Sequence, residues 1–437
     1  MSKFKQTEIG KIPENWEVEN LKEVCIKITD GSHFSPPTES TGKLIATVKD
    51  MKERGFDYST CRIISNEDYE KLVKQDCKPL KDDVLIAKDG SYLKHVFVSN
   101  GKDEIVILSS IAILRPNQLK IFPDFLKYLF TDSKTKARVS GNYVSGAVIP
   151  RIVLRDFEKI DLPIPPLPEQ RAIASILSSL DDKIELNNKM NKTLEAVGQA
   201  LFKRWFVDFE FPNEEGKQYK SSGGKMVESE LGEIPERWEV GKLGDVIEKI
   251  ESGRRPKGGI DSSHFEIPSV GAENIRGLGK YDYSKTKFIS KEFYDKMKTG
   301  IIKSKDVLLY KDGANIGRNS LFMNNFPFKE CCVNEHVFIL RSKKSFSQFF
   351  LYFWIDQKSM TQKIINLNSN AAQPGINQIS VISLPILIID NATRRSFDLF
   401  IEPLLSKIFY NCLQNRRLSQ IRDSLLPKLM SGVVRVR

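Results

Sequence analysis

The sequence predicts an α+β protein in which two duplicated, mixed α/β domains are separated by two long antiparallel helices with pseudo-twofold symmetry. Three observations lead to this prediction. The stretch "IGKIPENWEV" (9–18) recurs as "LGEIPERWEV" (231–240). Short β-type runs follow each copy, and each half closes with a long helical pattern. A chain of 437 residues is also too long for one ordinary core.

The repeat extends along the whole chain. The tripeptides "DVL" and "KDG" at 83–90 return at 306–313, and Pro150 and Ile152 return as Pro374 and Ile376. A nearly constant offset between matched segments indicates gene duplication. The segments 32–78 and 254–300, by contrast, share little. We therefore expect the two halves to share a common structural framework and to differ in these middle segments.

Each half carries the same elements in the same order. The first are short strands, "DDVLIAKDG", "HVFVSN" and "EIVILSSIAILRP" in one half and "KDVLLYKDG" and "EHVFILRS" in the other. A short amphipathic helix is expected next, at 122–130 and 347–355. A Gly/Asn loop (140–152 and 368–379) then leads to a proline-punctuated stretch and the long helix.

Apolar side chains recur every three or four residues over about 168–210 and 392–431, which is typical of long helices. At 1.5 Å per residue, each helix of about 40 residues is roughly 60 Å long. The expected organisation is a first domain at 1–160, a long helix at 161–212, a polar linker at 213–230, a second domain at 231–388 and a second long helix at 389–437.

Asparagines interrupt both apolar seams at matching positions. If the helices pair antiparallel, the predicted apolar pairs are Ile173 with Leu429, Leu177 with Leu425, Ile184 with Leu418, Leu194 with Ile408, Leu201 with Ile401, and Trp205 with Phe397. The same register places Asn187 opposite Asn415 and Asn191 opposite Asn411. Buried amides of this kind fix helix register at some cost in stability. The alternative is that these asparagines lie on solvated helix edges.

Composition favours a polyanionic partner. The 67 Lys and Arg residues against 56 Asp and Glu residues give a formal charge of +11, and cationic surfaces gain affinity by releasing counterions from DNA. A generally basic protein without such a partner is the alternative. The six cysteines show no C-x-x-C pair and the four histidines lie far apart, so we expect no zinc site. No secretory signal or membrane span is evident, which favours the cytoplasm.

No catalytic constellation is recognisable. The chain lacks a P-loop, a G-x-G-x-x-G after a strand, G-x-S-x-G, H-E-x-x-H and a Cys/His dyad. We therefore predict a protein without a catalytic site of its own and without a bound metal.

Five loops carry amide, hydroxyl and cationic side chains beside glycines, at 88–95, 140–146, 252–259, 311–319 and 368–375. Such side chains can bind base edges, since Arg and Lys pair with guanine and Asn and Gln with adenine. The candidate DNA-binding residues are Lys88, Ser91, Tyr92, Lys94, Asn142, Tyr143, Arg254, Arg255, Lys257, Lys311, Asn315, Arg318, Asn319, Asn370 and Gln373.

Simpler interpretations of these segments stay open. The two "KDG" sequences can be only tight turns, and "SGRRP" can be only solvated. For Trp16 and Trp238, which end the repeated opening, we favour an anchoring role in the core or against a helix over base stacking.

The order of motifs resembles the specificity subunit of type I restriction–modification systems. The motifs are the duplicated G-x-I-P-x-x-W-x-V opening, D-V-L before K-D-G, "AAQPGIN" (371–377), "PIPPLPEQRAIA" (163–174) before the first long helix, and "LLPKLMSG" (425–432) at the end of the last. The resemblance covers essentially the whole chain. Two departures are that "DGSHFSPP" (30–37) and "SGRRPKGG" (252–259) only approximate the family's Gly-rich G-x-T-P segment, and that "IIDNATRR" (388–395) replaces P-P-L-x-E-Q.

The resemblance implies two target-recognition domains that read a bipartite, asymmetric site in double-stranded DNA through the major groove, with the helices as a coiled-coil spacer. It also implies two modification subunits, which bind S-adenosylmethionine and methylate adenine, and two restriction subunits, which use ATP and Mg²⁺ for translocation and cleavage. The chain itself would bind no cofactor. Its sequence does not say whether the complex restricts DNA or only methylates it.

Two other functions stay in consideration. One is a duplicated protein-interaction scaffold without a DNA role, against which the charge and the amide-rich loops argue. The other is a single-chain enzyme whose site is not recognisable from its motifs.

Overall fold

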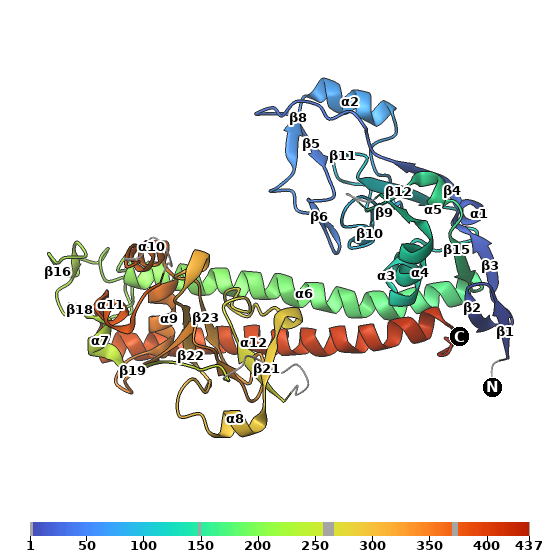
Figure 1. Ribbon diagram of the computed structural model, residues 1–437. Helices are drawn as coiled ribbons and strands as arrows, with labels where there is room; N and C mark the ends of the chain where they lie inside the picture. The colour runs from blue at the N-terminus through green and yellow to red at the C-terminus, as the bar shows by residue number, and fades with distance from the viewer. Residues whose placement is uncertain (1–2, 147–149, 257–265, 369–374, 437) are drawn as a thin grey trace. The chain divides into compact units, whose positions relative to one another are not determined.

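The computed structural model describes residues 3–146, 150–256, 266–368 and 375–436. The chain folds into two compact units, unit 1 with Met1–Lys183 and Leu418–Arg437, and unit 2 with Ile184–Arg417. Two helices of 40 residues, α6 (Leu167–Phe206) and α12 (Asn391–Met430), are green and red in Figure 1. Each contributes one part to each unit, whereas the sequence-based division treated each helix as a segment of its own.

A four-stranded antiparallel sheet forms the centre of unit 1, in the order β10-β9-β12-β4. Its strands are Val96–Val98, Val84–Ala87, Ile111–Pro116 and Cys25–Asp30. Val84 and Ile86 face a core shared with helix α3 (Pro123–Thr131), while Leu85 and Ala87 face a second core. Because both faces of β9 are buried, the strand is a continuous apolar run.

A three-stranded sheet, β11-β5-β8, accompanies the first, with β11 parallel and β8 antiparallel to β5. Its strands are Ile105–Ile107, Lys43–Ala46 and Arg62–Ile64. The remaining strands of unit 1 form two-stranded pairs, β1 (Phe4–Thr7) with β2 (Gly10–Pro13), β3 (Glu17–Asn20) with β15 (Asp161–Ile164), β6 (Met51–Lys52) with β7 (Gly55–Phe56), and β13 (Val144–Ser145) with β14 (Arg151–Ile152). Its other helices are α1 (Leu21–Val24), α2 (Asn66–Lys74), α4 (Ser133–Tyr143) and α5 (Leu154–Phe157).

Unit 2 repeats both sheets with the same order and strand directions. The larger sheet is β23-β22-β25-β19 (Asn319–Phe322, Asp306–Tyr310, Val337–Ser342, Ile247–Ser252). The smaller is β21-β20-β24 (Lys287–Ile289, Ile267–Val270, Cys332–Val333), with β24 parallel to β20. Two-stranded pairs join β16 (Met226–Val227) to β17 (Ile234–Pro235) and β18 (Glu239–Lys242) to β26 (Pro385–Ile388). The helices are α7 (Leu243–Val246), α8 (Lys291–Asp295), α9 (Gln348–Asp356), α10 (Lys358–Asn366) and α11 (Gln378–Ile382).

The two middles are more alike than their sequences indicate. Strand β8 leads through Ser65 into α2, and β21 leads through Ser290 into α8. Each serine caps its helix by accepting a hydrogen bond from the backbone N–H three residues on. The expectation of two dissimilar middles is therefore wrong for the strands, which keep one pattern through buried positions while surface residues differ.

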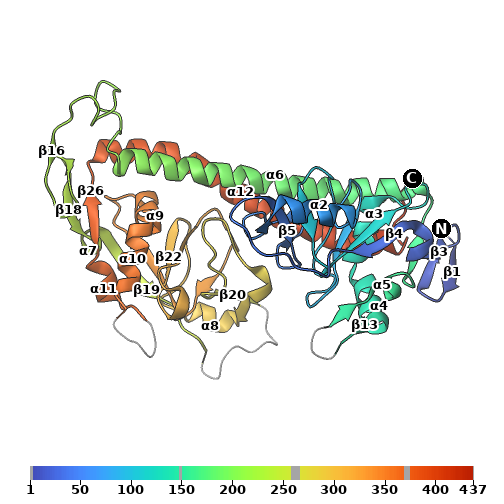
Figure 2. The same ribbon diagram turned by 90° about the horizontal axis from the view of Figure 1, so that it is seen from above.

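Helix α9 is apolar on all sides, contrary to the sequence-based expectation of an amphipathic helix. In α9, every residue from Phe349 to Ile355 is buried. The reason is that α9 lies between the sheet, where it adjoins β22 (Figure 2), and aromatic side chains of the long helices. Phe350 contacts Phe206 of α6, with ring centroids 4.8 Å apart, and Phe206 contacts Phe397 of α12 at 4.9 Å.

A buried carboxyl group paired with an arginine recurs in each large sheet. The guanidinium of Arg115 donates two hydrogen bonds of 2.9 Å to Asp83, and that of Arg341 donates bonds of 2.7 and 2.6 Å to Asp306. Both carboxyl groups are almost fully buried. Burial raises the pKa of Asp306, although Arg341 opposes the shift. A bidentate partner compensates the desolvation of each carboxylate.

The repeated tryptophans anchor the domains to the long helices, as predicted. Trp16 is fully buried, and its indole N–H donates to Glu169 Oε2 in the first turn of α6 over 3.1 Å. Trp238 donates to Asp390 Oδ2 over 2.9 Å, and Asp390 also accepts from the backbone N–H of Thr393 at the start of α12. Neither ring is available to stack on a base.

The long helices run antiparallel within unit 2 through a layer of amides. Asn187 Nδ2 donates to Asn415 Oδ1 over 2.8 Å, and Asn411 Nδ2 donates to Asn191 Oδ1 over 2.9 Å. These are the two amide pairs that the sequence predicts. Asn187 and Asn411 are fully buried, so the solvated-edge alternative is wrong for them.

The apolar residues of the two long helices belong to the hydrophobic cores of the units. In unit 2, Trp205 and Phe397 lie with ring centroids 6.1 Å apart, and Leu194, Leu201, Ile401 and Ile408 share their cluster. In unit 1, Ile173, Leu177, Leu425 and Leu429 belong to one cluster. The pair of Ile184 and Leu418 falls on the division between the units and stays a prediction.

Replacing Asn187 with alanine tests the amide layer. Asn187 also donates to Gln414 over 2.8 Å, so Asn187→Ala leaves two acceptors without their donor. We expect the free energy of unfolding to fall by about 1–3 kcal/mol, measured by urea unfolding with circular dichroism. Lys192→Ala, at an exposed position of α6, should change it by less than about 0.5 kcal/mol. Equal effects of both variants would contradict a stabilising amide layer.

Candidate nucleic-acid interface

The strand directions bring three loops of unit 1 to one edge of its large sheet. Strand β12 is antiparallel to β4 and to β9, with Ala112 opposite Asp30 and Ile111 opposite Ala87. Strands β4 and β9 therefore end where β12 begins. We call this side the loop edge of unit 1, formed by residues 31–41, 88–95 and 108–110.

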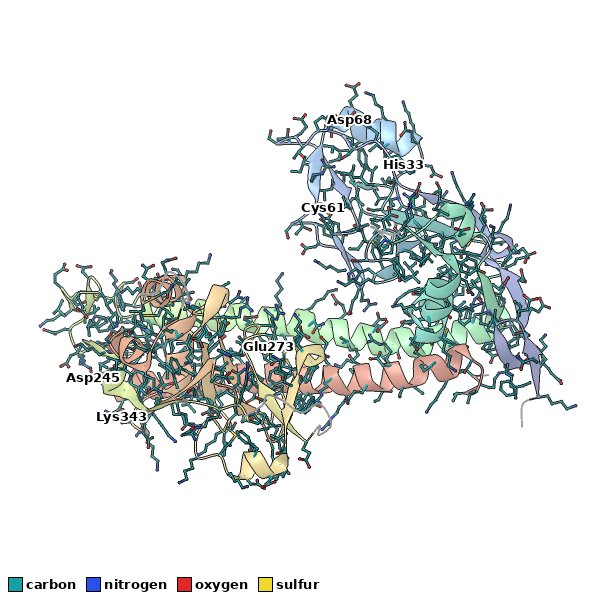
Figure 3. All side chains as sticks on the ribbon, viewed as in Figure 1. His33, Cys61, Asp68, Asp245, Glu273 and Lys343 are labelled. Carbon is teal, nitrogen blue, oxygen red and sulfur yellow. The ribbon has the colours of Figure 1, made fainter. Side chains whose placement is uncertain are left out.

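Unit 2 has the same loop edge, formed by residues 253–256, 311–318 and 334–336. Ser252 at the end of β19 lies opposite Phe338, and Tyr310 at the end of β22 lies opposite Val337. Lys343 and Asp245, labelled in Figure 3, mark the other end of these strands, where Lys343 Nζ donates to the Asp245 carbonyl over 2.7 Å. Most of the loops that the sequence singled out thus gather on one edge of each unit.

The two "KDG" sequences lie within the loop edges, and each changes the direction of the chain at its glycine. Gly90 and Gly313 have φ values of 65° and 74°, a left-handed conformation that glycine adopts without strain. A returning segment fastens each turn, because Ile152 N–H donates to the Lys88 carbonyl over 3.0 Å and Ile376 N–H to the Lys311 carbonyl over 2.9 Å. These bonds hold the neighbouring side chains at the loop edge, and the choice between a structural and a binding role for the two sequences stays open.

A close backbone approach fixes where the first loop of each edge begins. A Cβ atom on Gly31 would lie 2.1 Å from the Ile107 carbonyl oxygen, and one on Gly253 would lie 1.6 Å from that of Val333. Only glycine fits at these two positions. The frame of the loop edge is thus set by the repeated residues at the end of β4 and of β19.

Among the candidates in unit 1, Lys88 has a structural partner. Its ammonium group is 3.2 Å from Asp30 Oδ2, and both side chains are buried. The pair joins the first two loops of the edge. We therefore assign Lys88 a structural role, in which it holds these two loops together. Ser91 and Lys94 are exposed, whereas Tyr92 packs partly on the core.

Asn142 and Tyr143 are helical, and the sequence-based expectation of a loop there is wrong. Helix α4 continues to Tyr143, whose hydroxyl group donates to the Lys159 carbonyl over 3.0 Å. Strand β13 follows directly and pairs with β14. Arg151 of β14 forms an isolated antiparallel β-bridge, through the backbone, with Asp89. The two residues therefore adjoin the loop edge from its side.

In unit 2, Lys311, Asn315 and Arg318 lie in the second loop of the edge. The ammonium group of Lys311 is 5.1 Å from the centre of the Phe338 ring. Arg318 Nη2 donates to Asn315 Oδ1 over 2.6 Å, which leaves the Asn315 amide group at an exposed position. This arrangement presents a guanidinium and an amide together, the two groups that read guanine and adenine.

Asn319 lies below this surface. It begins β23, is 6% exposed, and is hydrogen-bonded to Asp356 at the end of α9. A side chain that points into the domain cannot contact a base edge, so Asn319 supports the loop from beneath. Lys257, Asn370 and Gln373 are candidates that fall outside the described residues.

A row of four polar side chains in contact crosses the loop edge of unit 2. Arg255 Nε is 2.9 Å from Glu335 Oε1, which lies 3.2 Å from His336 Nε2, and His336 Nδ1 is 2.9 Å from Asp312 Oδ2. Arg254 is exposed beside it. Glu335 and His336 are not among the residues that the sequence predicts. They directly precede β25, and this position places them at the loop edge only when the direction of β25 in the sheet is known.

The described residues contain no arrangement of three or more His, Cys, Asp or Glu side chains that suits a metal ion. Within the same residues, no helix combines the length and the apolar character needed to cross a bilayer.

Comparison with known proteins gives one family. The model of the type I restriction modification DNA specificity domain matches residues 13–196 and 235–388, once for each repeat. The MjaIX specificity subunit of the type I restriction enzyme of Methanocaldococcus jannaschii is 28% identical, over 100% of this chain and 97% of that protein. The HindI specificity subunit of Haemophilus influenzae is 27% identical, over 86% of this chain and 91% of its own.

A solved structure shares the fold. The crystal structure of a type I restriction–modification S subunit from M. genitalium superposes with a TM-score of 0.58, at 14% identity, over 95% of this chain and 96% of that one.

The carboxyl group of Asp356 makes stability depend on pH. Burial raises its pKa to about 6, although Asn319 and Gln199 donate hydrogen bonds to it. Because the folded state binds this proton more tightly than the unfolded chain, the group lowers stability as pH rises from about 4 through 6. We expect Asp356→Asn to stabilise the protein by about 1–3 kcal/mol at pH 8 and little at pH 4, measured by urea unfolding. The same gain at both pH values would contradict this assignment.

Proposed function

The chain belongs to the type I restriction modification DNA specificity family, and we propose that each of its units reads one part of a bipartite, asymmetric DNA target. The observation that carries the proposal is the pair of loop edges. Both are built on the same strands, turns and glycines, but they present different side chains. Two equivalent frames with different surfaces suit the reading of two different half-sites.

The chemistry of each edge supports base recognition. In unit 2, the Arg318 and Asn315 pair offers donors suited to guanine and adenine in the major groove. In unit 1, Ser91 and Lys94 occupy the corresponding loop. Phosphate contacts from other lysines and arginines would position the duplex, and the net charge of +11 favours them.

The proposal assigns recognition to this chain and chemistry to its partners. Two modification subunits would bind S-adenosylmethionine and methylate adenine, and restriction subunits would use ATP and Mg²⁺ to move along DNA and cleave it. This chain would bind none of these cofactors. The complex would act in the cytoplasm, with the long helices fixing the number of base pairs between the half-sites.

Mapping methylated adenine in the host genome, with and without this gene, tests the proposed function. We expect one bipartite motif to lose its methylation in the deletion strain and to regain it on complementation. An unchanged methylation pattern would contradict the assignment, and so would the loss of a single continuous motif.

Matched variants of the two loop edges test the independence of the units. Arg318→Ala removes a cation from unit 2 and Lys94→Ala removes one from unit 1. We expect Arg318→Ala in the purified complex to weaken binding to the intact target by about 1–3 kcal/mol and to relax sequence preference in one half-site only. Any change in preference from Lys94→Ala should fall in the other half-site. Competition with duplexes altered in each half measures this. Loss of preference in the same half from both variants would contradict two separate readers.

A further inference from the structure

An exposed aromatic side chain stands at the loop edge of unit 1. Phe34 is 64% exposed, and the neighbouring His33, labelled in Figure 3, has a side chain that is 79% exposed. Both residues follow directly on Gly31 and Ser32, where the chain leaves β4. Neither residue is among the DNA-binding candidates predicted from the sequence.

The loop that carries Phe34 is held on both sides. Ser32 N–H donates to the Ile107 carbonyl and Ser109 N–H to the Ser32 carbonyl, each over 2.9 Å. The hydroxyl group of Ser32 donates to the Phe34 carbonyl over 2.7 Å and accepts from the Phe34 N–H over 3.0 Å. The backbone at Phe34 is therefore fixed, although its ring is exposed.

Arg62 fastens the rest of this loop. Its guanidinium group donates to Ser35 Oγ over 2.7 Å and to the Pro36 carbonyl over 3.1 Å. Two consecutive prolines, Pro36 and Pro37, restrict the same segment further. An apolar ring on a rigid loop loses little conformational entropy on binding, which favours its use as a contact.

We propose that Phe34 contacts bases of the half-site read by unit 1 and contributes to its specificity. This inference rests on the proposed function. The neighbouring groups suit DNA, because Asp30 is neutralised by Lys88 at 3.2 Å and Ser91 and Lys94 share the edge. Phenylalanine recognises the thymine methyl group or a base face by apolar contact, without a hydrogen bond.

Leu119 provides a matched control. It is 85% exposed and belongs to the same unit, but it follows the end of β12 at the edge opposite the loop edge. If exposure of an apolar side chain alone decided the effect on DNA binding, substitutions at Phe34 and Leu119 would have the same effect. A contact with bases predicts an effect at Phe34 and none at Leu119.

The experiment compares binding of the complete complex to the duplex identified by methylation mapping and to a duplex with the unit 1 half-site scrambled. We expect Phe34→Ala to weaken binding to the intact target about 5- to 100-fold and to leave binding to the scrambled duplex within about twofold. Leu119→Ala should leave both unchanged.

The outcomes separate the two proposals. If the wild-type complex does not distinguish the intact from the scrambled duplex, the proposed function fails. If it does, and Phe34→Ala binds like the wild type or weakens both duplexes equally, the contact with bases is overturned.

A fluorescence measurement checks the contact independently of affinity. The four native tryptophans, Trp16, Trp205, Trp238 and Trp354, are all buried. In Phe34→Trp the added indole is therefore the exposed one. We expect the intact duplex to protect its emission from iodide quenching and to leave Leu119→Trp unprotected. Equal quenching with and without DNA would overturn the proposal.

Discussion

The hydrogen bond between a buried indole and a carboxylate at the start of a long helix is the contact on which the architecture depends. Trp16 bonds Glu169 in unit 1, and Trp238 bonds Asp390 in unit 2. A carboxylate there also interacts favourably with the helix dipole. The segment that follows the other long helix contacts the same indole. In unit 2, Phe211, after the end of α6, stacks on Trp238 with ring centroids 4.6 Å apart. In unit 1, the guanidinium group of Arg435, after the end of α12, lies 5.8 Å from the centre of the Trp16 ring. Each domain is thereby fastened to both long helices.

Rigid fastening of the domains allows their loops to differ. The strands, the bidentate arginine pairs and the glycines that meet a carbonyl oxygen recur in both units. The side chains above them do not, since unit 1 presents an exposed Phe34 and Lys94 where unit 2 presents a row of polar contacts through Glu335 and His336. If recognition resides in the loops, as proposed, while stability resides in the frame, a change of target need not disturb the core.

The frame could be predicted from the sequence, because repetition and apolar periodicity report it directly. The duplicated opening, the strands around "DVL" and the amide pairs of the long helices were all found in this way. The candidate site could be predicted only in part. Burial of Lys88 and Asn319 depends on contacts with Asp30 and Asp356, which lie far away in the sequence. Glu335 and His336 were missed because strand direction, which no local pattern gives, brings them to the loop edge.

The amide layer has an evolutionary consequence. Asn187 and Asn411 occupy equivalent positions of the two repeats, as do Asn191 and Asn415, so the bonds Asn187–Asn415 and Asn411–Asn191 are one contact made twice. Reciprocity of this kind defines an isologous interface between identical subunits. A single-repeat ancestor that paired with its own copy through these asparagines would have read a palindrome. Fusion of two such copies would have allowed each half to diverge, and would have made an asymmetric target accessible without a new fold.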